Sequence, residues 1–208
     1  MRMAIFGCGG FGREILRLAQ DVSTDAGGEP VFVADNPFGP VLNHAVITPD
    51  RLESEDQLVI AIGSPDSRRE VAARINRKCG ALIARSAIVG PGVTIGEGAI
   101  LCDYTIITAS AQIGRHFHCN LYSYVAHDCV IGDFVTFAPR VSCNGNVHVE
   151  DGAYVGTGAV IKQGTLGDPI VIGAGAVVGM GAVVTKSVPA GATVVGNPAA
   201  LLRQNATP

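Results

Sequence analysis

The sequence contains no tryptophan and only 5% aromatic residues, although 48% of its residues are hydrophobic. Its apolar content is therefore mainly aliphatic, which suits stacked β-strands. The net charge is only −3, so no basic face is indicated and we expect no nucleic acid partner. The best candidate for a membrane span, residues 169–185, is uncharged apart from its flanks but rich in glycine. We expect no membrane partner and a cytoplasmic location.

The six cysteines form no Cys-x-x-Cys pair, which argues against a zinc ribbon and against a redox motif. Several of them replace aliphatic residues in the repeat described next, so we expect buried thiols in a reducing compartment. They are Cys8, Cys79, Cys102, Cys119, Cys129 and Cys143.

An apolar residue returns at every sixth position over more than 70 residues. Period six is a multiple of the strand period of two and is unlike the helical 3.6. Glycine often follows the apolar residue, where a bend needs unusual torsions. This pattern predicts a hexapeptide β-helix, interrupted at residues 162–171 and resumed at Ile172. The uninterrupted positions are Val89, Ile95, Leu101, Ile107, Ile113, Cys119, Val125, Ile131, Phe137, Cys143, Val149, Val155 and Ile161.

A different pattern precedes the repeats. Residues 3–7 read as a buried strand, a G-x-G-x-x-G motif follows, and residues 13–19 read as a helix. This is the context of a phosphate-binding turn. The motif consists of Gly7, Cys8, Gly9, Gly10, Phe11 and Gly12.

Two further strands are expected at residues 31–34, before Asp35 and Asn36, and at residues 58–63, before a helix over 66–78. Such a short segment holds about four parallel strands, half of a dinucleotide fold, so it fits a mononucleotide better than NAD. We therefore predict an α/β half-Rossmann domain over residues 1–82, followed by an all-β parallel β-helix over residues 83–208.

Candidate catalytic residues lie in the polar turns of the repeat. A coil of three hexads returns after 18 residues, so Gly145 is expected to stack on His127 at about one strand spacing, 4.8 Å. Histidine suits proton transfer near neutral pH. Asp128 can orient its ring, and a backbone N–H of Gly145 can stabilise an oxyanion. Asn120 is expected in a neighbouring coil of the same constellation.

His116 and His118 leave a second possibility open. Together with His127 they could form a zinc site that activates water, as in carbonic anhydrases built on such a helix. Those enzymes need no glycine-rich nucleotide domain, so we expect no metal.

The chain as a whole resembles bacterial nucleotide-sugar acetyltransferases with a left-handed β-helix. That family includes the bacillosamine-pathway and perosamine N-acetyltransferases and the sialic acid O-acetyltransferases. The resemblance is carried by the hexads and by four segments, which are residues 7–14, 61–63, 125–132 and 196–199.

The resemblance implies a homotrimer in polysaccharide biosynthesis, with acetyl-CoA as cosubstrate in the groove between two subunits. It implies His127 as general base, Asp128 as its acidic partner, Asn120 as an active-site amide and Gly145 as oxyanion donor. A second active-site histidine of the family is replaced by Thr136. The nucleotide-activated amino sugar is expected to contact Gly7, Gly9, Gly10, Phe11, Gly12, Asp35, Asn36, Gly63, Ser64 and Arg68, and acetyl-CoA to contact Gly145, Thr157, Gly158 and Gly175.

The expected reaction is direct transfer of acetyl from acetyl-CoA to the amine of a nucleotide-linked 4-amino-deoxy or 4-amino-dideoxy sugar, in a ternary complex. Two alternatives remain open beside the zinc enzyme. One is an O-acetyltransferase acting on a sugar hydroxyl such as that of a sialic acid. The other is a sugar-nucleotide-binding protein without catalysis.

Overall fold

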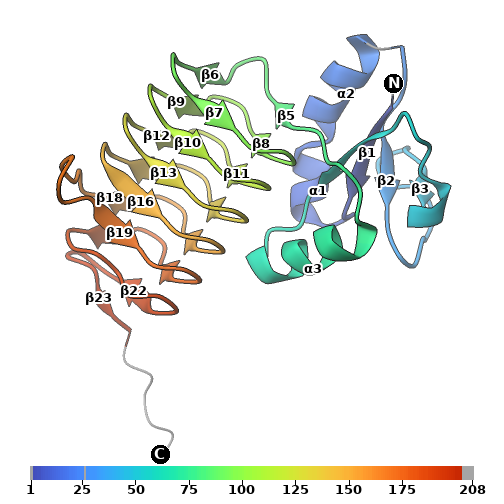
Figure 1. The fold of residues 1–208 in the computed structure, drawn as a ribbon. Helices are drawn as coiled ribbons and strands as arrows, with labels where there is room; N and C mark the ends of the chain where they lie inside the picture. Colours follow the sequence, from blue (N-terminus) through green and yellow to red (C-terminus); the bar gives the residue numbers. More distant parts are fainter. Residues whose placement is uncertain (1, 26, 203–208) are drawn as a thin grey trace, which may run out of the picture.

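The computed structural model describes residues 2–25 and 27–202 and divides into an N-terminal α/β domain and a β-helix (Figure 1). The domain has a parallel sheet of order β3-β2-β1-β4. Its strands are β1 (Met3–Phe6), β2 (Val31–Val33), β3 (Val46–Ile47) and β4 (Gln57–Ile60), and its helices are α1 (Gly10–Glu14), α2 (Leu16–Asp25), the 3-10 turn η1 (Pro49–Arg51) and α3 (Pro65–Ile75).

The glycine motif is more helical than expected. Residues 13–19 are helical as predicted except at Ile15, but the helix already begins at Gly10 and the break at Ile15 divides it into α1 and α2. Gly12 allows this early start, because a Cβ at this position would clash with the carbonyl oxygen of Gly7 at the end of β1. Any larger residue would therefore force α1 away from β1. Helix α3 begins with Ser64 as its N-cap and ends at Ile75, three residues before the expected end.

The β-helix confirms the hexapeptide prediction. Its short strands form three sheets that are parallel except for the final antiparallel pair of β22 with β23. From β5 to β21 each strand pairs with the strand three elements away, as Tyr124 on β12 pairs with Ile106 and with Ser142. These partners are 18 residues apart, so three hexads make one left-handed coil. The strands are β5 (Leu82–Ile83), β6 (Ile88–Val89), β7 (Thr94–Ile95), β8 (Ile100–Leu101), β9 (Ile106–Ile107), β10 (Gln112–Ile113), β11 (His118–Cys119), β12 (Tyr124–Val125), β13 (Val130–Ile131), β14 (Thr136–Phe137), β15 (Ser142–Cys143), β16 (Val147–Val149), β17 (Tyr154–Val155), β18 (Val160–Ile161), β19 (Ile170–Ile172), β20 (Val177–Val178), β21 (Val183–Val184), β22 (Thr193–Val195) and β23 (Ala200–Leu201).

The hexad residues form one continuous core along the coil axis, including the buried thiols of Cys119, Cys129 and Cys143. Phe117 and Phe137 meet edge-to-face inside it, with ring centroids 5.1 Å apart. Since the apolar positions point inward, the chemistry of the β-helix is left to its three lines of turns.

Each line of turns is named here after one histidine or asparagine. The Asn120 corner comprises residues 102–105, 120–123, 138–141 and 156–159. The His127 corner comprises residues 108–111, 126–129, 144–146 and 162–169. The His116 corner comprises residues 96–99, 114–117, 132–135, 150–153 and 173–176. The interruption of the repeat is a loop on the His127 corner, where the Gly164 N–H donates to the Gly145 carbonyl.

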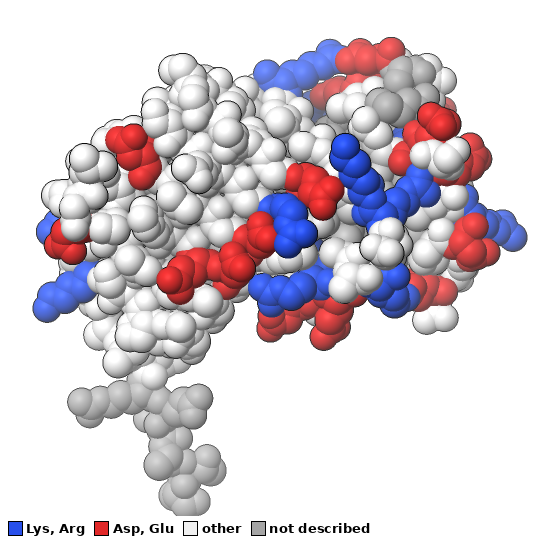
Figure 2. All heavy atoms as spheres, in the orientation of Figure 1, with Lys and Arg blue, Asp and Glu red and all other residues white. Residues whose placement is uncertain are grey.

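A short segment connects the two domains. The chain leaves α3, passes through residues 76–81 and enters β5, which pairs with β8, so the expected division after residue 82 falls inside β5. Charged side chains gather over the N-terminal domain and in a line where it meets the β-helix, while the visible β-helix face is mostly uncharged (Figure 2). None of the helices in residues 2–25 and 27–202 has both the length and the apolar character to cross a membrane.

Candidate active site

His127 and Asp128 form an oriented pair on the His127 corner. The ring Nδ1 lies 2.8 Å from Asp128 Oδ2, and both side chains are about half exposed. A carboxylate at Nδ1 holds the proton there and leaves Nε2 free to accept one. Asp128 adopts a positive φ of 57°, which turns its side chain back onto the histidine. The pair therefore has the geometry of a general base and its orienting acid.

Gly145 lies on the next coil, against the His127 ring, in agreement with the 18-residue spacing. A Cβ at this position would lie 2.5 Å from both Cε1 and Nε2 of His127, so only glycine fits beside the ring. Among the described residues, the Gly145 N–H makes no backbone hydrogen bond, although its carbonyl accepts one. An uncommitted N–H beside a base is suited to stabilising an oxyanion.

Asn120 lies elsewhere, and the expectation that it shares a constellation with His127 within one chain is wrong. It belongs to the Asn120 corner, and β12 separates it from His127 along the edge of the coil. At about 3.3 Å per residue, such a hexad spans up to about 20 Å. The 18-residue rule places residues above one another, but Asn120 and His127 are only seven residues apart and so lie on different corners.

A pocket of about 240 Å³ opens at the Asn120 corner, between α1 and the β-helix. Glu14, Asn120 and Thr157 are among its polar lining groups, and its walls are otherwise largely apolar. Five of the lining residues were not predicted from the sequence as site residues, although Tyr154 and Ala138 stand 18 residues after Thr136 and Asn120. These residues are Glu14, Phe137, Ala138, Pro139 and Tyr154, and His118, expected only as a possible zinc ligand, lines the pocket as well.

The glycine motif borders this pocket through Phe11. Gly7 has a φ of 115° and lies against the Ala61 carbonyl, so it shapes the turn after β1. Gly9 and Gly10 have open space where a side chain would be, which leaves their backbone accessible to a ligand. The turn therefore combines two packing glycines, Gly7 and Gly12, with two open ones.

Asp35 and Asn36 follow β2 at the carboxyl edge of the same sheet, where ligands bind in open α/β folds. Both are exposed. The Asp35 carboxylate accepts two hydrogen bonds from Arg74, at 2.6 and 2.9 Å, and this pairing holds the pKa of Asp35 below its usual value. A ligand that uses this carboxylate must therefore share or displace Arg74.

The residues after β4 divide into two groups. Gly63 lines the pocket, as expected of a sugar contact. Ser64 is occupied as the N-cap of α3, where its Oγ accepts from Ser67 N–H at 3.4 Å. The expectation that Arg68 contacts the nucleotide sugar is wrong, because its side chain is 0% exposed and lies in the domain interface.

The residues expected to bind acetyl-CoA lie on all three corners. Gly145 is on the His127 corner, Thr157 and Gly158 are on the Asn120 corner, and Gly175 is on the His116 corner. Thr157 lines the pocket beside Asn120. One chain therefore does not bring these residues into a single groove.

The three histidines of the zinc alternative do not converge. His118 is buried, with Nε2 3.0 Å from the Ile60 carbonyl and Nδ1 3.1 Å from an Arg68 nitrogen. Burial and the Arg68 charge hold its pKa well below 6.5, so it is neutral. His116 stacks on Phe134 at the His116 corner, whereas His127 lies on another corner. Across the described ranges, no three histidine, cysteine or acidic residues cluster as metal ligands would.

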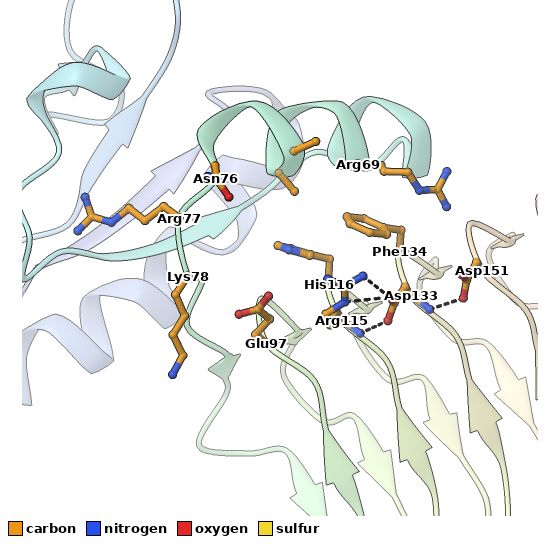
Figure 3. Close-up of a pocket in the computed structure, with 12 residues that line it drawn as sticks. Arg69, Asn76, Arg77, Lys78, Glu97, Arg115, His116, Asp133, Phe134 and Asp151 are labelled. Atoms are coloured by element: carbon orange, nitrogen blue, oxygen red, sulfur yellow. Dashed lines mark hydrogen bonds and ion pairs between the residues drawn. The ribbon is translucent and has the colours of Figure 1, made fainter.

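A second groove, of about 630 Å³, lies between α3 and the His116 corner (Figure 3). Phe134 is sandwiched between His116, at 4.9 Å, and the Arg69 guanidinium, at 5.1 Å. Below it, Arg115 pairs with Asp133, whose N–H donates to Asp151. Arg69, Arg115 and Asp133 are thus already in ion pairs, and the groove lies apart from the His127 corner.

Comparison with known proteins supports the same interpretation. Residues 2–75 match the PglD N-terminal domain family. A GDP-perosamine N-acetyltransferase from Escherichia coli O157:H7 is 44% identical over 214 residues, covering 98% of this chain and 97% of that protein.

Two solved structures share the whole architecture. The acetyltransferase domain of PglB from Neisseria gonorrhoeae FA1090, in complex with acetyl coenzyme A, is 30% identical with a TM-score of 0.85, over 97% of this chain and 98% of that one. PerB from Caulobacter crescentus, in complex with CoA and GDP-perosamine, is 26% identical with a TM-score of 0.86, over 98% of both chains. With its fold, its histidine-acid pair and its glycine turn, this chain belongs to the family of bacterial nucleotide-sugar N-acetyltransferases built on a left-handed β-helix.

Proposed function

We propose that the protein transfers acetyl from acetyl-CoA to the amino group of a nucleotide-linked 4-amino sugar, and that GDP-perosamine is its substrate. The observation that carries this is the oriented His127–Asp128 pair beside the uncommitted N–H of Gly145. The choice of GDP-perosamine rests on the relative that covers nearly the whole chain and on the PerB complex.

In the proposed mechanism, the sugar amine attacks the thioester carbonyl carbon in a ternary complex. The new C–N bond forms as His127 Nε2 takes a proton from the amine, and Asp128 stabilises the imidazolium through Nδ1–H. The Gly145 N–H stabilises the tetrahedral oxyanion. The C–S bond then breaks and CoA leaves as a thiolate, so no acyl-enzyme is needed.

The separation of the two corners supports a homotrimer as the catalytic unit. The sugar pocket lies at the Asn120 corner and the base at the His127 corner of the same sheet. If three such sheets face a common axis, the Asn120 corner of one subunit lies beside the His127 corner of the next. Acetyl-CoA then occupies the groove between subunits, with Gly145 and Thr157 supplied by different copies. A cytoplasmic location fits this cosubstrate.

The test is a substrate panel. The protein is incubated with acetyl-CoA and with UDP-, dTDP- or GDP-linked 4-amino sugars or free sialic acid, and CoA release and product mass are followed. Turnover with an N-acetylated GDP-sugar product is expected. Acetylation of sialic acid alone would establish the O-acetyltransferase instead, and nucleotide-sugar binding without acetyl-CoA binding would establish a non-catalytic protein.

A further inference from the structure

The Arg68 guanidinium is a buried cation held by both domains. From the segment after β4, the carbonyls of Ile62 and Gly63 accept from Nη1 at 2.7 and 3.4 Å. From the β-helix, Nη2 donates to the Phe134 and Val135 carbonyls at 2.7 and 3.2 Å. The remaining acceptors are Thr136 Oγ1, at 3.0 Å, and His118 Nδ1, at 3.1 Å.

This cation is costly to bury. Among its hydrogen-bond partners in the described part of the chain there is no carboxylate. Burial lowers the pKa of Arg68 to about 9, so it remains charged at neutral pH. Apolar packing of the same volume usually stabilises a protein as well as a buried charge does. The four N–H groups of Nη1 and Nη2 are instead shared among six acceptors from both domains, and this planar arrangement defines the orientation of one domain relative to the other.

Three of the six partners of Arg68 belong to the wall of the sugar pocket. Gly63, His118 and Thr136 all line that pocket, and Thr136 Oγ1 also donates to the Gly63 carbonyl at 3.1 Å. His118 continues the contact by donating from Nε2 to the Ile60 carbonyl. A shift of the N-terminal domain would therefore move Gly63 and Phe11 relative to Thr136 and Asn120.

The outer side of this contact is visible in Figure 3. Arg69, one residue further along α3, points over Phe134 into the second groove and is exposed. Its carboxylate partner is Asp66 on the same helix, at 3.2 Å. Arg69 thus offers a matched control, an arginine on the same helix turn that does not join the hydrogen-bond network between the domains.

We propose that Arg68 is a positioning residue for acetyl transfer. It fixes the N-terminal domain on the β-helix, so that Gly63 and Phe11 are held in the correct position relative to Thr136 and Asn120 across the sugar pocket. This inference rests on the proposed function for its kinetic consequence, although the domain contact itself does not. Arg68 touches no substrate and acts through Gly63, His118 and Thr136.

The kinetic test compares Arg68→Met, Arg68→Lys and Arg69→Met with the wild type. Loss of the fork should raise KM for the nucleotide sugar about tenfold or more, because a small misplacement of binding groups is costly. KM for acetyl-CoA should stay within about twofold, since Thr157 alone among its expected contacts lines the sugar pocket and none of them belongs to the N-terminal domain. Arg68→Lys, which keeps the charge and loses the fork, should lie between, and Arg69→Met should match the wild type.

A second measurement separates positioning from stability and from the assigned reaction. Hydrogen exchange of residues 60–68 and 132–137, well below the melting temperature, should accelerate in both Arg68 variants and not in Arg69→Met. If Arg68→Met fails to fold, Arg68→Lys alone decides. Equal changes in both KM values, or unchanged KM and exchange, would overturn the proposal. If the wild-type protein showed no acetyl transfer, the proposed function would be refuted instead. Hydrogen exchange and calorimetric measurement of GDP binding would then still test the role of Arg68 in the contact between the domains.

Discussion

At the scale of single residues, the site depends on how closely a histidine ring can approach a backbone. The His127 ring lies against Gly145, and any side chain there would displace it. The carboxylate of Asp128 then sets the ring tautomer from the other side. Two neighbours thus fix both the position of the base and the ring nitrogen that carries its proton.

Gly145→Ala tests that packing. The added Cβ would lie 2.5 Å from the His127 ring, so the ring must rotate away, and kcat should fall by on the order of 10²-fold. The control is Gly39→Ala, where no atom lies within 4 Å and φ is not positive, and which should leave kcat unchanged. A Gly145→Ala enzyme with normal kcat would show that the ring position does not matter.

At the scale of elements, the hexad pattern predicted the β-helix well because its cause is local. Each inward position faces the same core in every coil, so the sequence repeats with the structure. The break at residues 162–171 was visible for the same reason. The early start of α1 at Gly10 was not, because it depends on the close approach of Gly12 to the Gly7 carbonyl across the turn.

A buried histidine on β11, His118, also makes folding stability depend on pH, and the hexad pattern does not predict this. His118 is neutral in the folded protein, with its pKa held well below 6.5 by burial and by Arg68. The unfolded chain binds a proton there near pH 6.5, so folding stability should be intact above that pH and should fall as the pH drops below it. One such group contributes up to about 1.4 kcal/mol per pH unit.

His118→Gln isolates this effect, since its amide can still donate to the Ile60 carbonyl. Urea unfolding between pH 7 and pH 5 should show a smaller loss of unfolding free energy in the variant than in the wild type. His116, whose pKa is also lowered by burial, acts in the same direction and remains in both proteins. Identical pH slopes for the two proteins would contradict the assignment.

At the scale of the whole molecule, function depends on which corners and domains come together. The sequence showed that His127 stacks under Gly145, because that relation is a simple multiple of the repeat. The same spacing rule also separates Asn120 from His127, because seven residues are not a multiple of the coil. The sequence did not show that Arg68 is buried, since this follows from how the N-terminal domain rests on the β-helix. The relative position of residues stacked in successive coils can therefore be predicted from the sequence. The position of residues between the two domains cannot.

Mixed oligomers test the arrangement of subunits. His127→Ala and Asn120→Ala chains, each with very low activity alone, are co-expressed with different tags and purified together. If the base and the pocket come from different copies, one of the three sites in each mixed trimer should combine an intact His127 with an intact Asn120. Activity no higher than that of either parent would place both residues of one site in the same chain.

The central claim is that His127 is the base of an acetyl transfer to a nucleotide-linked amine. Its most direct test is the steady-state rate of acetylation of GDP-perosamine by His127→Ala, beside His148→Ala as a control histidine on the same β-helix. The account predicts a loss in kcat on the order of 10²-fold or more for His127→Ala, and wild-type kcat for His148→Ala. Wild-type kcat in His127→Ala would contradict it.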